Sequence, residues 1–245
     1  MKKVSLILTT YNCKAFLIQT LDCIEKQTYP NLEIVIVDGA SSDGTLEIIK
    51  EYAKSNNNTK WISEKDKGIY DAINKGIDLA TGDYIEIMND RYTRDDAIEK
   101  MVQVLEQNTE CVGIHTDLVY MEGNQVKRYW KMGQGNIYQG WMPGHPTLLL
   151  KKEIYEQYGR YDTMYVCSAD YEFMVRFLKD KKNQLAYVPE TLVAMYYGGT
   201  SNATFGSYMV SLKESYMALR KNKVSFALWI CGLRTLRVLG QFVKK

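Results

Sequence analysis

The chain has 245 residues, a formal net charge of +2 and 46% hydrophobic residues. This length fits one α/β domain with a smaller lobe, and the composition is that of a globular protein with a sizeable core. A net charge so close to zero argues against a nucleic-acid-binding protein. The five cysteines are scattered without a CxxC pair, which favours reduced thiols in a cytosolic protein over a disulfide framework or a zinc site.

The first apolar run, residues 4–8, is too short for a signal peptide and is followed at once by polar residues. A buried first strand explains it better. No stretch of the sequence reaches the roughly 18 apolar residues that a membrane-spanning helix needs.

Two periodicities alternate through the first half of the chain. Short apolar runs predict buried strands, and apolar residues at helical spacing predict helices. The predicted strands cover residues 4–8, 32–37, 60–63 and 83–88, and the predicted helices cover residues 15–26, 46–54, 68–80 and 97–105. This alternation predicts an α/β fold with a mainly parallel, doubly wound sheet.

Polar residues follow each of these strands, at the sheet edge where such folds bind ligands. Tyr11 offers a ring face for a planar base, and Asp38 offers an acceptor for its imide edge. Lys67 directly precedes a helix N-terminus, a place that favours phosphate. Asp38 and Asp43 are also common turn and cap residues. Polar loops at successive strand ends nevertheless favour a nucleotide site, although neither a dinucleotide fingerprint nor a P-loop is present.

The sequence pattern of the second half of the chain predicts a hairpin, a strand and a helix. Residues 111–120 and 125–132 form the hairpin, and residues 168–180 form a partly buried helix that Ser168 can cap. Asp170 then lies in the first helical turn, where an acid also stabilises the helix dipole. His145 precedes the strand and is either a ligand of a metal or pyrophosphate, or a buried loop histidine.

The tail is a helix over residues 213–222 followed by a basic amphipathic segment, residues 224–245. Its apolar residues can share one broad face, and they are Trp229, Ile230, Leu233, Leu236 and Leu239. The segment is either an interfacial helix on an anionic membrane or a helix packed on the domain. Because all the other motifs lie upstream, the chain is expected to fold without it.

Several separated motifs together resemble family 2 glycosyltransferases. They are "VSLILTTYN", "LEIVIVDGASSDGT", "ISEKDKGIYDAINKGIDLATGDYI" and "PGHPTLLLKKEIYEQYGRYD" followed by "SADYEFMVRF". Such enzymes are inverting transferases with a GT-A fold, and this chain is similar to those of bacterial polysaccharide assembly. The resemblance implies a GT-A domain over residues 1–202, with a nucleotide-binding half to about residue 110, an acceptor-side half over 111–202, and a helical tail over 203–245.

The resemblance also implies roles for the polar loops. It places Thr9 and Tyr11 at the base, Asp38 at the imide edge, Asp43 near the base or ribose, and Asp66, Lys67 and Asp71 along the nucleotide and diphosphate. For Asp71 the alternative is a first-turn acid favoured by the helix dipole.

The stretch "IMNDRYTRDD" departs from the family pattern. The family usually has a metal-binding stretch ending in aspartate here, whereas this chain reads Asn89-Asp90-Arg91 and is apparently one residue shorter. A donor diphosphate favours Mn²⁺ or Mg²⁺ held by carboxylate oxygen, so Asp90 is the expected ligand, with His145 as a second contact. Alternatively Arg91 supplies the positive charge, or the loop has lost its metal site. Asp95 and Asp96 are expected to cap the next helix.

Asp170 is the general base that the resemblance implies, and Glu172 is the second candidate, expected to be a structural partner. The implied function is inverting transfer from a nucleotide-sugar, with a uridine donor expected, to a saccharide or lipid-linked saccharide. The expected location is the cytoplasm, with peripheral contact at the inner membrane face through residues 224–245. A sugar nucleotidyltransferase and a non-catalytic nucleotide- or partner-binding relative are the alternatives.

Overall fold

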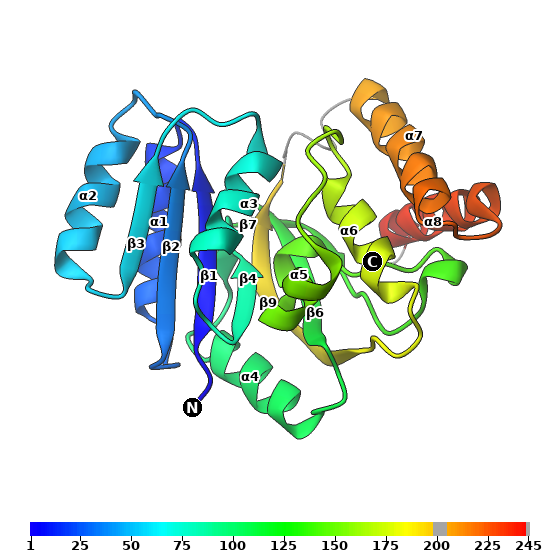
Figure 1. Cartoon of the computed structure of the whole chain (residues 1–245), viewed down its shortest axis with the longest axis horizontal. Helices are drawn as coiled ribbons and strands as arrows, with labels where there is room; N and C mark the ends of the chain where they lie inside the picture. The colour runs from blue at the N-terminus through cyan, green and yellow to red at the C-terminus, as the bar shows by residue number, and fades with distance from the viewer. Residues whose placement is uncertain (198–204, 244–245) are drawn as a thin grey trace.

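The computed structural model describes residues 1–197 and 205–243. One mixed sheet runs through the centre with helices on both faces (Figure 1). Its strands are β1 (Val4–Thr10), β2 (Leu32–Asp38), β3 (Thr59–Ser63), β4 (Tyr84–Ile87), β5 (Arg91–Tyr92), β6 (Gly113–Glu122), β7 (Gln125–Trp130), β8 (Leu149–Lys151) and β9 (Leu185–Tyr196). The α-helices are α1 (Lys14–Glu25), α2 (Thr45–Ser55), α3 (Ile69–Leu79), α4 (Ala97–Gln107), α5 (Lys152–Tyr158), α6 (Ala169–Leu178), α7 (Phe205–Lys221) and α8 (Ala227–Val243). Short 3₁₀ helices are η1 (Ile137–Gln139) and η2 (His145–Thr147).

The strand order is β3-β2-β1-β4-β8-β6-β9-β5, with β7 paired to β6. Strands β3, β2, β1 and β4 are parallel, which confirms the doubly wound arrangement expected for the first half. Strand β8 is antiparallel to both β4 and β6, whereas β6 and β9 run parallel. Strands β6 and β7 form the expected hairpin, which turns at Gly123 with a φ of +56°.

Apolar side chains fill both faces of the sheet. Helices α1, α2 and α4 cover one face, where Leu21, Ile49 and Met101 pack against strand residues. Helices α3, α5 and α6 cover the other face, where Ile73 and Phe173 are buried. The cysteines are free thiols, as their spacing predicted. The carboxyl ends of β1, β2 and β3 are therefore held on a rigid, doubly covered sheet.

Helices α7 and α8 pack onto α6 and enter the second of these cores. Val224, Ala227, Ile230 and Cys231 are all buried there. Because this segment completes a core, the structure supports the alternative that the tail packs on the domain. That the chain folds without residues 224–245 stays a prediction. The boundary expected at residues 202/203 falls within 198–204, outside the described residues.

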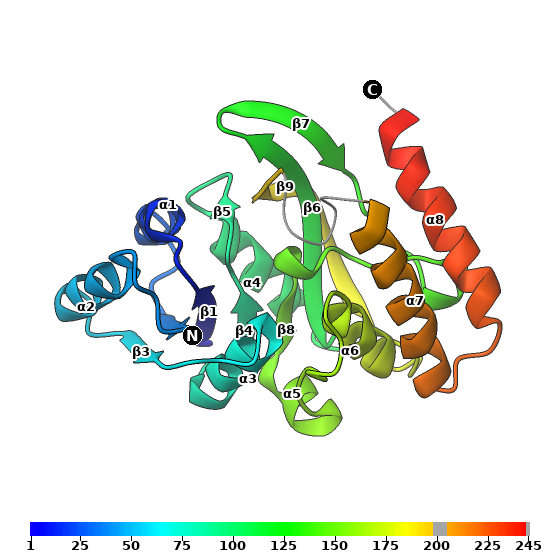
Figure 2. The ribbon, with the colours of Figure 1, turned by 90° about the horizontal axis from the view of Figure 1, so that it is seen from above.

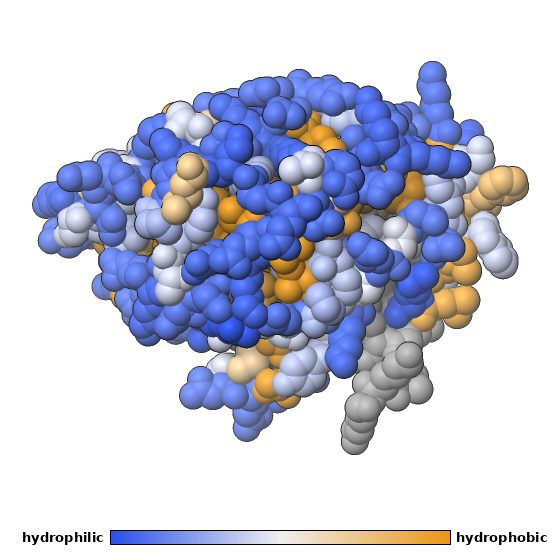
Figure 3. Space-filling model, turned by 90° about the horizontal axis from the view of Figure 1, so that it is seen from below, coloured by the Kyte–Doolittle hydropathy of each residue, from blue (hydrophilic) through white to orange (hydrophobic). Residues whose placement is uncertain are grey.

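The surface of α8 carries a second apolar set. Leu228, Trp229 and Leu236 are exposed although Ile230 is buried, so the single broad face expected from the sequence is divided between two sides of the helix. The side chain of Leu239 lies outside the described residues. Figure 3 shows a largely hydrophilic face with apolar patches, including some at the end formed by α7 and α8. Within the described part of the chain, no helix is both long and apolar enough to span a membrane.

Candidate active site

The loops after β1 and β2 are joined by side-chain hydrogen bonds. Asn12 has a φ of +46°, and its backbone N–H donates to Ser41 Oγ at 2.9 Å. Its side-chain Oδ1 accepts from the Ser42 N–H at 2.8 Å. The left-handed conformation is one that asparagine tolerates better than most residues. These contacts fix the two loops as one platform.

Tyr11, Gly39 and Asp66 come together on this platform, from the loops after β1, β2 and β3. A Cβ added at Gly39 would lie 2.6 Å from Asp66 Oδ2 and 3.2 Å from Tyr11 Cδ2. Only glycine fits such a close approach without displacing a neighbour. The Tyr11 ring is 67% exposed, so its surface is open to a ligand. The expected convergence of these loops at one sheet edge is therefore seen for Tyr11 and Asp66.

Asp38 is completely buried beneath the platform. Its carboxylate accepts from Thr10 Oγ1 at 3.0 Å, Ser63 Oγ at 2.7 Å, and both the N–H and Oγ of Ser41 at 3.0 and 2.5 Å. Burial alone would raise the pKa of Asp38, but these hydrogen bonds together lower it. The carboxylate therefore stays ionised and ties three loops together, with its acceptor positions already filled by the protein.

The side chains of Asp43 and Asp71 accept hydrogen bonds from backbone N–H groups at the beginnings of helices. Asp43 accepts from the Lys14 N–H at 3.1 Å and from the Thr45 N–H at 3.0 Å, at the beginnings of α1 and α2. Asp71 accepts from the Lys67 N–H at 3.0 Å and lies 3.4 Å from Lys75 Nζ. These contacts match the turn and capping alternative for Asp43, and the position of Asp71 matches its alternative as a first-turn acid. The exposed side chain of Lys67 lies just before the start of α3, where its charge and the helix dipole both favour a phosphate.

Thr9 is locked to the altered stretch after β4. Its N–H donates to Asn89 Oδ1 at 2.8 Å, and Asn89 Nδ2 donates to Thr9 Oγ1 at 2.9 Å. The next residue, Asp90, is half-buried and accepts a long hydrogen bond, 3.4 Å, from the Tyr196 N–H. Burial raises the pKa of Asp90 to about 6, against the opposing effects of that N–H and of Arg91. Asn89 is an anchor that the sequence reasoning did not single out.

Few of the described side chains are grouped in a way that suits a metal ion. Across residues 1–197 and 205–243, no three histidine, cysteine or carboxylate side chains lie close enough to hold a metal ion together. Asp90 fits a cation that is held mainly by a diphosphate and water, as Mg²⁺ often is. His145 fits less well, because its Nε2 lies 2.7 Å from the Tyr161 hydroxyl and it lines a different cavity from Asp90. Burial lowers the pKa of His145, so the ring is neutral.

A cavity of about 1060 Å³ lies between the β6–β7 hairpin and helices α6, α7 and α8. Asp170, in the first turn of α6, lines it together with His145. The Tyr70 hydroxyl, from α3, donates to Asp170 Oδ1 at 3.3 Å. Tyr70 and Tyr161 stack with ring centroids 6.0 Å apart. Asp170 therefore stands at a junction between α3, the helix that follows the platform, and the large cavity.

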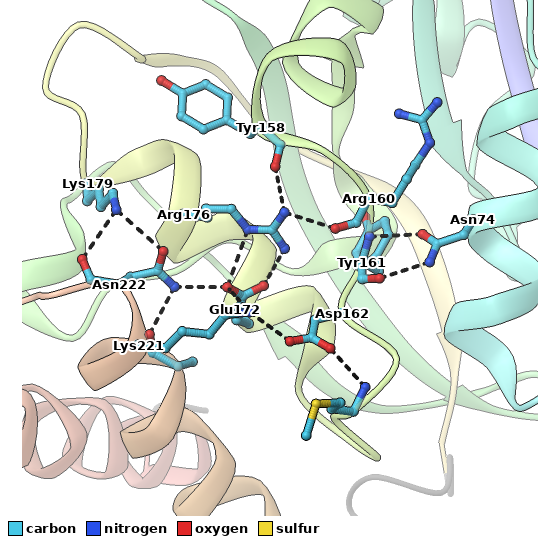
Figure 4. A network of polar contacts seen from close by, with 12 residues as sticks. Asn74, Tyr158, Arg160, Tyr161, Asp162, Glu172, Arg176, Lys179, Lys221 and Asn222 are labelled. Atoms are coloured by element: carbon cyan, nitrogen blue, oxygen red, sulfur yellow. Dashed lines mark hydrogen bonds and ion pairs between the residues drawn. The ribbon is translucent and has the colours of Figure 1, made fainter.

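Glu172 faces away from this junction, into a buried polar network (Figure 4). It pairs with Arg176 in the same helix, accepts from Asn222 Nδ2 at 3.0 Å and lies 3.1 Å from Lys221 Nζ. Burial would raise the pKa of Glu172, but Arg176 and Asn222 lower it. Glu172 therefore ties α6 to the end of α7, which agrees with the structural role expected for it.

Two expected caps were wrong. Ser168 stands at the N-cap of α6 without capping it, and its hydroxyl lies 3.2 Å from that of Ser211 instead. Asp96 stands at the N-cap of α4, but its carboxylate binds the Arg94 guanidinium at 2.7 and 2.8 Å. Ser168 is thus held by a tertiary partner, and Asp96 by a cation two residues before it, in place of the backbone N–H groups of the helix.

The family model for glycosyl transferase family 2 matches residues 5–181. The chain belongs to glycosyltransferase family 2. This family 2 glycosyltransferase is 30% identical over 209 residues to a PGL/p-HBAD biosynthesis glycosyltransferase of Mycobacterium tuberculosis, covering 81% of this chain and 78% of the relative. It is 26% identical over 248 residues to a glycosyltransferase of Haemophilus influenzae, covering 94% of this chain and 76% of that one. The expectation of a transferase is thus confirmed, against the non-catalytic alternative.

Solved structures share the fold of this family 2 glycosyltransferase. S. aureus TarS in complex with UDP-GlcNAc superposes with a TM-score of 0.71 at 15% identity, covering 96% of this chain and 72% of that one. Mannosyltransferase PcManGT from Pyrobaculum calidifontis, in complex with GDP-Man and Mn²⁺, gives a TM-score of 0.68 at 17% identity, covering 100% and 76%. These likenesses confirm the GT-A fold that the sequence predicted.

Proposed function

We propose that the protein transfers a sugar, with inversion, from a nucleoside-diphosphate sugar to a saccharide or lipid-linked saccharide. The donor nucleotide would lie on the platform at Tyr11, Gly39 and Asp66, within the half formed by residues 1–110. The acceptor would enter the cavity of about 1060 Å³ from the half formed by residues 111–202 and from the tail helices. The single observation that carries this proposal is the Tyr70–Asp170 contact at 3.3 Å, because a carboxylate in that position would lie where the two proposed sides meet.

Asp170 supplies the chemistry that an inverting displacement needs. Its carboxylate takes the proton from the acceptor hydroxyl as that oxygen attacks the anomeric carbon, and the nucleoside diphosphate leaves from the opposite face. Tyr70 orients the carboxylate by its hydrogen bond. Burial, followed by the charge of Asp170, raises the pKa of Tyr70 far above its usual value, so the hydroxyl keeps its proton and acts as a donor.

Uridine is the proposed base and a divalent cation the proposed cofactor. Thr9 and Tyr11 would flank the base, with Asp38, Asp43 and Asp66 supporting that pocket and Lys67 and Asp71 at the diphosphate end. A cation on Asp90 would offset charge that develops on the leaving diphosphate. The structural neighbours themselves carry different nucleotides, UDP-GlcNAc in TarS and GDP-Man in PcManGT.

Peripheral membrane contact is proposed through the corner between α7 and α8. Phe226 and Trp229 are 81% and 68% exposed there, and the corner residues Lys223 and Phe226 both have positive φ values, of 58° and 61°. Exposed aromatic rings beside lysines suit an anionic lipid surface. Such contact would place the acceptor cavity near the inner face of the cell membrane.

A panel of nucleotide-sugars, tested for thermal stabilisation with and without Mn²⁺, examines this function. A ligand that binds only the folded state raises the melting temperature, and the shift grows with the logarithm of its concentration divided by its dissociation constant. We expect a UDP-sugar to give the largest shift and Mn²⁺ to increase it. The proposal fails if no nucleotide-sugar stabilises the protein, or if a nucleoside triphosphate and a sugar phosphate instead release pyrophosphate.

A further inference from the structure

The acceptor cavity carries an excess of positive charge. Among the described residues that line it, the cations are Arg128, Lys131, Arg234 and Arg237, and the one carboxylate is Asp170. His145 adds no charge, because burial lowers its pKa. The protein as a whole is nearly neutral at +2, so this excess is local to the cavity.

Contacts within the protein hold two of these arginines at the cavity wall. The Arg234 guanidinium lies 4.2 Å from the ring centroid of Tyr171, the residue next to Asp170, and it also donates to Ser215 Oγ. Arg237 Nε donates to the Gln139 carbonyl at 2.9 Å. None of these partners is an anion, and within the described chain no carboxylate forms an ion pair with Arg234 or Arg237. Their charge therefore remains available to a ligand.

The close packing of α8 on η1 fixes this arrangement. Gly140 follows η1 with a φ of +66°, and a Cβ there would lie 2.5 Å from the backbone nitrogen of Arg234. The helix that carries Arg234 and Arg237 thus rests directly on a glycine. On the opposite wall, the Arg128 guanidinium lies 4.0 Å from the ring centroid of Tyr120. Cations therefore border the cavity from both sides.

The donor diphosphate is not well placed to use these charges. The platform at Tyr11, Gly39 and Asp66 belongs to β1, β2 and β3, whereas Arg234 and Arg237 belong to α8. Figure 2 shows α8 at the opposite end of the molecule from α1 and α2. Asp170 lies between, in contact with Tyr70 of α3. The arginines are thus on the acceptor side of the candidate base.

We propose that the acceptor carries an anionic group, a phosphate or a carboxylate, which Arg234 and Arg237 bind while Asp170 receives the proton of the acceptor hydroxyl. This inference rests on the proposed function. Arginine suits the role because its planar guanidinium matches both oxyanions in a bidentate geometry. The anion is either part of an acidic sugar or the phosphate that links a sugar to a lipid.

Three short probes separate these sources, and calorimetry without donor measures their binding. Hexyl β-glucoside is neutral, hexyl β-glucuronide carries a carboxylate on the sugar, and glucose 1-(hexyl phosphate) carries a phosphate between sugar and chain. We expect at least one anionic probe to bind about tenfold or more tightly than the neutral one, and added salt to weaken that preference. The preferred anionic probe identifies the source.

Substitutions show whether the arginines cause the preference for an anionic probe over the neutral one. Arg237→Gln should remove most of it, Arg237→Lys should retain part of it, and Lys127→Gln should retain all of it. Lys127 is the control because it is a cation of the β6–β7 hairpin, next to Arg128, that does not line the cavity and instead pairs with Glu122 at 2.6 Å. Arg237 is exposed, and an unchanged melting temperature would verify that its variants are folded.

UDP binding is measured in parallel and should be the same in all variants. Equal binding of neutral and anionic probes, or no measurable binding of any probe at millimolar concentration, would overturn the inference. A loss of UDP affinity in Arg237→Gln would also overturn it, by assigning the arginine to the donor. Failure of the proposed function shows separately, as an absence of nucleotide-sugar binding or of any effect of Asp170→Asn on transfer.

Discussion

The Tyr70 hydroxyl and the Asp170 carboxylate lie 3.3 Å apart, although their positions are separated by 100 residues in the sequence. Tyr70 belongs to the first turn of α3 and Asp170 to the first turn of α6. The contact joins the helix that follows the platform at Tyr11, Gly39 and Asp66 to the helix that borders the large cavity. It therefore gives the carboxylate a fixed orientation at the point where donor and acceptor would meet.

Asp170→Asn should reduce transfer by about 100-fold or more, because the amide cannot accept the proton of the acceptor hydroxyl. Donor affinity should stay close to that of the wild type. Tyr70→Phe should give a smaller loss in kcat, since it removes only the orienting hydrogen bond. Steady-state kinetics would measure both, with Asp180→Asn, at a half-buried acid just beyond the other end of the helix, as control. Asp170→Asn retaining most of its transfer rate would exclude this residue as the base.

Asp90→Ala should abolish the enhancement of UDP binding by Mn²⁺. Because burial raises the pKa of Asp90 to about 6, the wild-type enhancement should also weaken as the pH falls from 7 to 5 and the carboxylate takes up a proton. Calorimetry with and without Mn²⁺ at several pH values would measure this. Asp95→Ala, at an exposed acid between β5 and α4, is the control. Enhancement that survives in Asp90→Ala would remove Asp90 from the metal site and favour Arg91 as the source of positive charge.

The fold of the first half was predictable because its strands and helices each carry a local pattern. The continuous apolar runs of β1 and β2 are typical of strands covered on both faces, and the structure confirms them as parallel neighbours. The second half was less predictable, since its order depends on long-range pairing. Nothing in the sequence around Leu149–Lys151 indicates that β8 lies between β4 and β6, antiparallel to both.

The site was predictable as a set of loops but not as a set of contacts. Tyr11 and Asp66 converge as their positions after two parallel strands suggested. The hydrogen bond between Asn89 and Thr9 joins residues far apart in the sequence, and no local pattern indicates it. Arg234 and Arg237 were noticed only as charges of a basic tail. Their place at the acceptor cavity depends on α8 packing against Gly140, which no local pattern reveals.

Glu86→Gln should change how stability depends on pH. Glu86 is completely buried in β4, where desolvation raises its pKa to about 8 and its Oε2 accepts from the Tyr92 hydroxyl at 2.8 Å. Between its ordinary pKa of 4.5 and about 8, the folded protein holds a proton that the unfolded chain releases. The contribution of Glu86 to the free energy of unfolding should therefore be greatest below pH 4.5. It should fall as the pH rises from 4.5 through about 8.

The glutamine variant stays neutral and should lose this decline, becoming more stable than the wild type at pH 8 and above. Denaturant unfolding at pH 5, 7 and 9 would measure the difference. Glu156→Gln, an exposed position in α5, is the control and should leave the slope unchanged. An identical pH dependence in wild type and Glu86→Gln would mean that Glu86 is ionised in the folded state at neutral pH.

The two sides of α8 provide a matched pair of variants for the tail. Ile230 is 1% exposed and Trp229 is 68% exposed, so neighbouring residues report packing and surface contact separately. Ile230→Ser should destabilise the fold by about 3 kcal/mol or more, because it removes buried apolar volume and introduces a polar group. Trp229→Ser should leave the melting temperature unchanged, yet it should reduce sedimentation with vesicles containing anionic lipid. Salt should weaken wild-type attachment, since it screens the attraction of lysine and arginine to the lipid. Equal sedimentation of Trp229→Ser and wild type, or no sedimentation of either, would show that the exposed side of α8 does not meet the membrane.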